Sequence, residues 1–116
     1  MPAAKHELRI EQGANFDVSI TYYDSTGAAV NLTSYTARTK FRPTYGDSPI
    51  LTLTTENGGI TLGGAAGTIT IAASAIATAA LDAPSKGVYD VEVANPSGNV
   101  TRIIEGKYTV TPEATK

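Results

Sequence analysis

The chain has 116 residues and a mass of 12.0 kDa, the size of one domain, and its 41% hydrophobic and 17% charged residues are typical of globular proteins. It contains one His, no Cys and no Trp, so a disulfide scaffold, a thiol nucleophile and every Cys-based metal site are excluded. Nine Lys and Arg against eleven Asp and Glu give a formal net charge of −2. Because nucleic-acid binding needs a clustered excess of Lys and Arg, this balance argues against it.

A membrane segment is not expected either. Residues 1–7 contain no apolar stretch of the kind that a secretory signal peptide has. Residues 57–81 carry no charge and are long enough to cross a bilayer. Five glycines divide that segment into short pieces that suit turns, so we expect no membrane partner.

Alternating apolar and polar residues predict two strands near the N-terminus. The first covers residues 7–12, with Leu8 and Ile10 on one face. The second covers residues 16–23, where every second residue is apolar and the neighbouring Tyr22 and Tyr23 must face opposite ways. A turn follows at residues 24–27 because Asp can bond to the backbone and Gly accepts a positive φ.

The same alternation continues through the middle of the chain. Residues 35–42 form a predicted strand that Pro43 ends, because proline cannot donate to a strand ladder. Residues 50–55 form the next strand, and residues 60–62 and 68–71 are predicted to pair as a hairpin across the glycines of residues 63–67.

Residues 74–81 are the one expected helix. Ser74 is a good N-cap, the following alanines favour a helix, and Ile76 and Ala80 share a face. Two turns are not stable alone, so this helix is expected to cap one end of a sheet. Two more strands follow at residues 88–94 and 100–110, the second with a possible bulge at Gly106.

Seven or eight short strands at a spacing of 8–12 residues, with one short helix, predict an all-β fold. We expect an immunoglobulin-like antiparallel β-sandwich, with a small barrel as the alternative. Residues 1–116 form a single domain in this prediction, with short flexible termini that include residues 111–116.

Catalytic chemistry finds little support in the residues. His6 has no nucleophile elbow or positioned partner nearby in the sequence. Asp90 and Glu92 share one strand face, where a paired acid and base is conceivable, but charge balance with a neighbouring strand is favoured. No Lys follows the glycines of residues 63–67 and a strand comes next, so a phosphate loop is disfavoured. We therefore expect no enzyme, and we assign no catalytic, cofactor-binding or metal-binding residue.

A basic stripe is the best candidate for contact with other molecules. Arg38, Lys40 and Arg42 alternate along one strand and so point to one face, with Tyr45 in the following loop. A solvated charged face, a protein contact and a nucleic-acid contact all remain open, the last disfavoured by the overall charge. We predict protein contacts at Arg38, Lys40, Arg42 and Tyr45, and at the terminal residues 1–5 and 111–116.

Several segments, spread over nearly the whole chain, carry a family resemblance. They are residues 11–16 (EQGANF), 20–27 (ITYYDSTG), 29–38 (AVNLTSYTAR), 67–71 (GTITI), the helix at 74–81, 87–93 (GVYDVEV), 98–106 (GNVTRIIEG) and 110–115 (VTPEAT). With these motifs the chain resembles small virion structural proteins of tailed bacteriophages and prophages. It is also similar to the N-terminal attachment domain of phage baseplate proteins.

The resemblance implies a structural component of a tailed-phage virion, at the tail, neck or baseplate, made in the host cytoplasm. Its partners would be other virion proteins, contacted by protein–protein packing in many symmetric copies, with no cofactor and no nucleic acid. A capsid decoration (cement) protein is the first alternative. A carbohydrate-binding module for host adhesion is the second, and the lack of Trp makes it less favoured.

Overall fold

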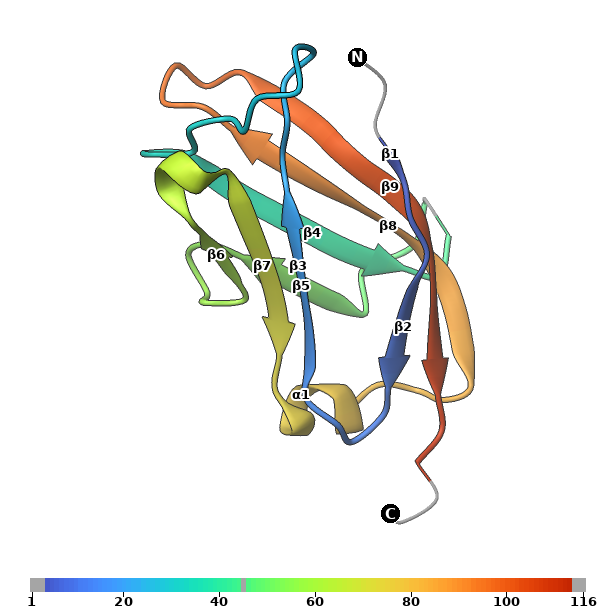
Figure 1. Cartoon of the computed structure of the whole chain (residues 1–116). Coiled ribbons are helices and arrows are strands. Elements are labelled where there is room, and N and C mark those ends of the chain that lie inside the picture. The colour runs from blue at the N-terminus through green and yellow to red at the C-terminus, as the bar shows by residue number, and fades with distance from the viewer. Residues whose placement is uncertain (1–3, 45, 114–116) are drawn as a thin grey trace.

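Two β-sheets pack face to face in the computed structural model, which describes residues 4–44 and 46–113 (Figure 1). A short helix closes one end of the sandwich. The described elements are β1 (Ala4–Lys5), β2 (Leu8–Glu11), β3 (Phe16–Thr21), β4 (Thr36–Arg42), β5 (Leu51–Thr54), β6 (Ile60–Leu62), the 3-10 turn η1 (Gly64–Ala66), β7 (Thr68–Ala73), α1 (Ala75–Ala79), β8 (Ser85–Ala94) and β9 (Val100–Thr111).

The strand order is that of an immunoglobulin-like sandwich. The larger sheet runs β1-β9-β8-β4-β5, with β2 also paired to β9, and the smaller sheet runs β3-β7-β6. The chain crosses between the sheets after β2, after β3, after β5 and after β7, while the hairpins β4-β5, β6-β7 and β8-β9 stay within one sheet. The expected all-β sandwich is therefore confirmed, and the barrel alternative is excluded.

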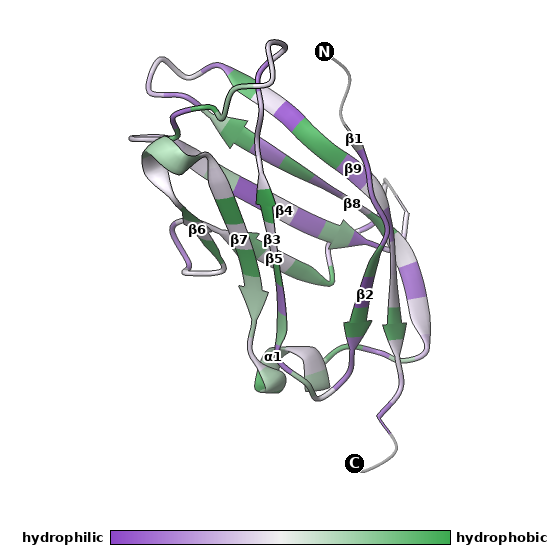
Figure 2. Cartoon of the chain, in the orientation of Figure 1, coloured by the Kyte–Doolittle hydropathy of each residue, from purple (hydrophilic) through white to green (hydrophobic). Residues whose placement is uncertain are grey.

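Alternation along the strands builds the core between the sheets, as the hydropathy colours of Figure 2 show. Phe41 lies at its centre and is fully buried. Its ring stacks on Tyr89 at 5.3 Å and meets the edges of Tyr108 at 5.3 Å and Phe16 at 6.5 Å. These rings connect β4, β8 and β9 of the larger sheet to β3 of the smaller one, so they help to hold the two sheets together.

The N-terminal edge departs from the expected antiparallel pattern. The strands β1 and β2 both run parallel to β9, with Ala4 opposite Ile104 and Leu8 opposite Tyr108. Residues 4–5 and 111, which the sequence analysis placed in the termini, thus belong to strands, while residues 1–3 and 114–116 lie outside the described residues. The two ends of the described chain lie at opposite ends of the sandwich (Figure 1).

Gly106 is not the bulge that the sequence analysis expected. It pairs in regular register with Tyr89, and the irregularity lies between Val91 and Glu92, where Ile103 is the extra residue on β9. Gly106 instead allows the backbone of His6 to approach, because a Cβ at position 106 would collide with the His6 carbonyl oxygen. That close approach holds the parallel edge strand against β9.

The helix α1 is shorter than the expected 74–81, and the residue that it buries is polar. Ser74 is the N-cap as predicted, and its Oγ accepts from the Ala77 amide at 3.2 Å. Ile76, which shares a face with Ala80, is 85% exposed. The buried residue is Thr78, whose hydroxyl donates to the Ala14 carbonyl at 2.8 Å and accepts from the Gly13 amide at 3.1 Å. Thr78 thus ties α1 to the loop before β3, while Ala77 packs against the core and Leu81, just after the helix, is buried in it.

The uncharged residues 57–81 form β6, η1, β7 and α1 with their connecting turns. Within residues 4–44 and 46–113, none of the helices has the length and apolar character needed to traverse a bilayer.

Candidate functional site

Strand β4 presents the predicted basic stripe on the outer face of the larger sheet. Arg38 and Lys40 are exposed and Arg42 is half-buried, whereas the alternate residues Ala37, Thr39 and Phe41 are buried. The prediction that the three cations share one face is confirmed. The fourth predicted contact residue, Tyr45, lies outside the described residues.

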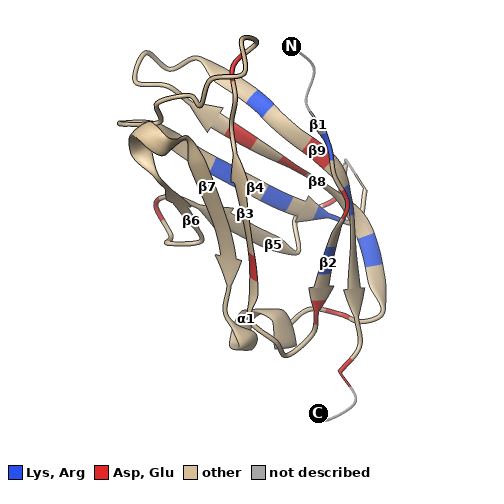
Figure 3. Cartoon of the chain, viewed as in Figure 1, with Lys and Arg blue, Asp and Glu red and all other residues tan. Residues whose placement is uncertain are grey.

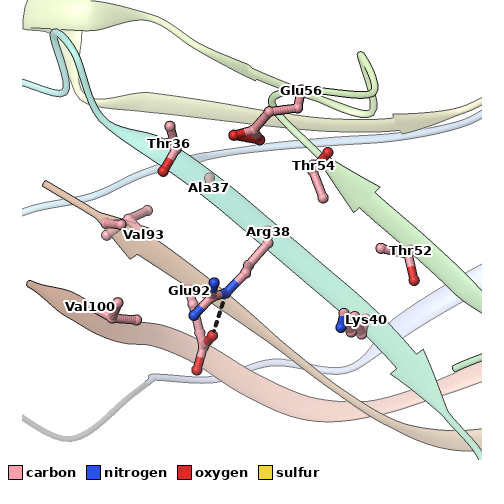
Figure 4. A pocket seen from close by; sticks show the side chains of 11 residues that line it. Thr36, Ala37, Arg38, Lys40, Thr52, Thr54, Glu56, Glu92, Val93 and Val100 are labelled. Atoms are coloured by element: carbon pink, nitrogen blue, oxygen red, sulfur yellow. Dashed lines mark hydrogen bonds and ion pairs between the residues drawn. The ribbon is translucent and has the colours of Figure 1, made fainter. Parts of the chain in front are cut away.

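Neighbouring strands supply carboxylates to this face. The Arg38 Nε lies 2.8 Å from Glu92 Oε1, the contact drawn in Figure 4. Arg102 of β9 lies between two acids, with Nε 3.3 Å from Asp90 Oδ2 and Nη1 3.5 Å from Glu105 Oε2. Asp90 and Glu92 thus balance basic residues of adjacent strands, as the sequence analysis favoured.

The environment of Asp90 differs from that of a free surface carboxylate. Partial burial raises the pKa of Asp90 above its ordinary value, and the neighbouring charge of Glu92 raises it further. The guanidinium groups of Arg102 and Arg42 act in the opposite direction. Burial of Asp90 has the largest effect. The two guanidinium groups therefore do not return the pKa of Asp90 to its ordinary value.

Of the three cations in the stripe, Lys40 makes the fewest side-chain contacts within the described residues. Arg38 is held by Glu92, and the Arg42 Nη1 donates to the Asp47 carbonyl at 2.6 Å. Within the described part of the chain, no carboxylate lies within ion-pair distance of the Lys40 ammonium. Lys40 is also a lining residue of a shallow hollow of about 420 Å³ between β5, β4 and β8 (Figure 4).

Strand register adds cations that sequence reasoning missed. Arg42 is opposite Val88, and Val88 is opposite Lys107. Two pairs along the strands, and so on the same face, Lys86 is opposite Thr109, and Thr109 is opposite Arg9. We call Arg9, Arg42, Lys86 and Lys107 the basic patch. Alternation marks each as an outward residue, but only the register reveals that residues so distant in sequence share one surface.

The charge of the whole molecule is divided unevenly (Figure 3). All eight Lys and Arg of the described residues lie on the outer face of the larger sheet: Lys5, Arg9, Arg38, Lys40, Arg42, Lys86, Arg102 and Lys107. Four acids share that face: Glu11, Asp90, Glu92 and Glu105. The other seven lie in loops, near strand ends or on the smaller sheet: Glu7, Asp17, Asp24, Asp47, Glu56, Asp82 and Glu113. The outer face of the larger sheet is thus basic, although the chain as a whole has a net charge of −2.

The outer face of the smaller sheet has a different character. Its outward positions are Asp17, Ala72 and a set of hydroxyl side chains: Ser19, Thr21, Thr61, Thr68 and Thr70. The hydroxyls of Ser19 and Thr70 are hydrogen-bonded at 2.9 Å. This surface is nearly neutral, so charges introduced on or next to it are suitable controls for charge changes on the larger sheet.

The other candidates from the sequence are His6 and the glycines of residues 63–67, and they lie outside the basic stripe. The imidazole of His6 is exposed, while its backbone amide donates to the Glu105 carbonyl at 3.1 Å. The glycines at residues 63–67 surround η1, and β7 follows directly, so they form a turn as favoured. Among the described residues, no three of His, Asp and Glu gather closely enough to hold a metal ion.

Comparisons with known proteins define the class of fold. The chain is similar to a solved structure of a chicken TCR, with a TM-score of 0.53 and 14% sequence identity. The similarity covers 94% of this chain and 55% of the TCR chain, so this chain spans about half the length of that one. No protein-family model matches the sequence, and no curated protein does. The likeness establishes an immunoglobulin-like β-sandwich, and the Cys pair and Trp common in antibody domains are absent.

Proposed function

We propose that this chain is a non-enzymatic structural component of a tailed-phage virion, placed at the tail, neck or baseplate. It acts by packing against other virion proteins through the outer face of the larger sheet. The observation that carries this proposal is the concentration of lysines and arginines on that one face. The resemblance of the sequence motifs to small virion proteins supplies the biological setting.

The physical argument rests on how ordered charges recognise a partner. Exposed ion pairs such as Arg38–Glu92 contribute only about 0–1 kcal/mol each to stability, so their arrangement does little for the fold itself. Charges fixed on a sheet suit recognition, because they select complementary surfaces and set the orientation of docking. Repetition in a symmetric particle multiplies a modest contact into a stable assembly.

A charge reversal at Lys40 tests this proposal. Reversing Arg38 would break its ion pair with Glu92, whereas Lys40 is opposite Asp90 on the sheet but makes no ion pair within the described residues. Lys40→Glu is expected to lower the copy number in purified particles severalfold. Because the new acid would face Asp90, we expect a small loss of thermal stability, and thermal unfolding of the variant checks that it still folds. The measurement is quantitative mass spectrometry of particles assembled with each variant.

The matched control changes the net charge equally on another surface. Thr61→Glu with Ala65→Glu adds two negative charges on and next to β6, where both side chains are exposed. This control should assemble normally. Equal loss for both variants would show that total charge matters rather than Lys40, and normal assembly of Lys40→Glu would remove this face from the contact.

Electron microscopy of particles made without the protein separates the proposal from its alternative. Missing or unfinished tails agree with a tail, neck or baseplate component. Heads that leak or burst would instead identify a capsid decoration protein.

A further inference from the structure

We infer that the basic patch of Arg9, Arg42, Lys86 and Lys107 is a docking surface for an acidic region of another protein. The inference rests on the proposed function, in that the partner is a neighbouring virion protein, and it deepens that function by naming the surface and the chemistry of its occupant.

The patch is basic because the acids of the larger sheet are confined to other rows. Moving along the strands, Arg38, Glu92 and Arg102 form one row, and Lys40, Asp90, Glu105 and Lys5 form the next. These two rows contain ion pairs. The following rows hold the four cations of the patch with Val88 and Thr109 between them, and the exposed Glu7, just before β2, lies level with Lys107 at the edge of the patch. Glu11 comes one row further on.

The four cations are available to a partner. Arg9, Lys86 and Lys107 are exposed, and none of them has an ion pair within the described residues. Arg42 gives one hydrogen bond to the Asp47 carbonyl and makes no ion pair within the described residues, although its charge also acts on Asp90 in the neighbouring row. Val88 is partly exposed at the centre and offers a small apolar contact among the charges. A cluster of four cations without an ion pair attracts negative charge over roughly one Debye length, about 8–10 Å.

An acidic protein surface fits this patch better than a nucleic acid does. The rows beside it hold Asp90, Glu92 and Glu105, which would repel the phosphates of an extended duplex. The described part of the outer face carries no aromatic side chain on which a base could stack. A protein partner can place its own charges to match both the basic patch and the mixed-charge rows.

Charge also argues against a second copy that docks with the same face. Two outer faces brought together would each contribute twice as many cations as acids, eight against four in the described chain. Like charges brought together in a contact are costly, so an isologous dimer through this face is disfavoured. The occupant is therefore a different and acidic surface.

Binding of labelled poly-L-glutamate to the isolated protein tests the inference directly. Fluorescence anisotropy at low salt is expected to show binding that weakens as salt rises. Lys86→Gln with Lys107→Gln should weaken it about tenfold, or about 1.4 kcal/mol. Thr61→Glu with Ala65→Glu changes the net charge by the same amount on the other face and should leave binding within about twofold.

Three outcomes would overturn the inference. Tighter binding of a labelled duplex DNA through the same lysines would make the patch a nucleic-acid site. Equal weakening by both double variants would show attraction by total charge only. No binding of either probe at low salt would make the patch a solvated surface.

The particle assay keeps the two proposals separate. If Lys86→Gln with Lys107→Gln loses poly-L-glutamate and also fails to enter particles, both stand. If the protein is absent from particles altogether while the probe binds through these lysines, the virion function fails and the docking surface remains. If the variant enters particles normally although probe binding is lost, the partner is not a virion protein.

Discussion

The hydroxyl groups of Tyr89 and Tyr108 are both buried beside Phe41, and their surroundings differ. The Tyr89 hydroxyl donates to the His6 carbonyl at 2.7 Å, and burial raises the pKa of Tyr89 to about 12. The Tyr108 hydroxyl has no hydrogen-bond partner within the described residues. A buried hydroxyl without a partner costs free energy, whereas a paired one returns part of that cost.

Single oxygen deletions should therefore affect the two tyrosines differently. Tyr89→Phe is expected to lower the free energy of unfolding by about 1 kcal/mol, since it leaves the His6 carbonyl unpaired. Tyr108→Phe should leave the stability unchanged or raise it. Urea unfolding of the two variants measures both effects, and an equal loss in both would contradict the hydrogen-bond assignment.

Two carboxylates are expected to titrate on opposite sides of their ordinary pKa of 3.8. Burial and Glu92 raise the pKa of Asp90, whereas hydrogen bonds from the Thr26 hydroxyl and the Ala28 and Thr26 amides lower the pKa of Asp24. Between 3.8 and its raised pKa, Asp90 binds a proton more readily in the folded chain, so its contribution to stability grows as the pH falls through that window. Asp24 contributes stability above 3.8 and loses it as the pH falls through its lowered pKa.

Asp90→Asn should therefore lose stability more steeply than the unchanged protein as the pH falls from neutrality toward 3.8. Carboxyl carbon NMR titration gives the two pKa values, and urea unfolding over the same range gives the stability. An Asp90 midpoint below that of Asp24 would refute the assignment.

At the scale of the element, the parallel edge depends on one small residue. Gly106→Ala is expected to displace the His6 backbone and so loosen β1 and β2 from β9, with a loss of about 1–3 kcal/mol. Gly46→Ala is the matched control, because a Cβ there meets no atom within 4 Å. Hydrogen exchange of the His6 amide, bonded to the Glu105 carbonyl, reports the change locally. Unchanged protection in Gly106→Ala would show that the edge accommodates a methyl group.

Elements that depend on local pattern were predictable from the sequence. The alternation around Phe41 and Ile10 marks strands with a buried face, and Ser74 marks the start of the helix. The buried residue of α1 was not predictable, because Thr78 bonds to a loop outside the helix while the apolar residue Ile76 is exposed. The position of the bulge likewise depends on how β8 meets β9, which neither strand encodes alone.

At the scale of the whole molecule, the strand register determines which charged residues share a surface. Residues of one strand can be grouped from the sequence, whereas residues of different strands cannot. Arg38, Lys40 and Arg42 belong to one strand, so two-residue spacing was enough to group them. Arg9 and Lys86 share one surface only through the pairing of β2 with β9 and of β9 with β8, and a shift by one residue would turn either strand's side chains to the other face. The overall charge of −2 averages a basic face with acidic loops and so hides both.

The pairing of the first strands with the last one has a mechanical consequence. Because β2 runs parallel to β9 and the chain ends leave from opposite ends of the sandwich, tension between the ends pulls these strands lengthwise past each other. The backbone bonds that join them then bear the load together instead of opening singly from one end. A domain held at both ends would thus resist stretching through the pairing of β1 and β2 with β9.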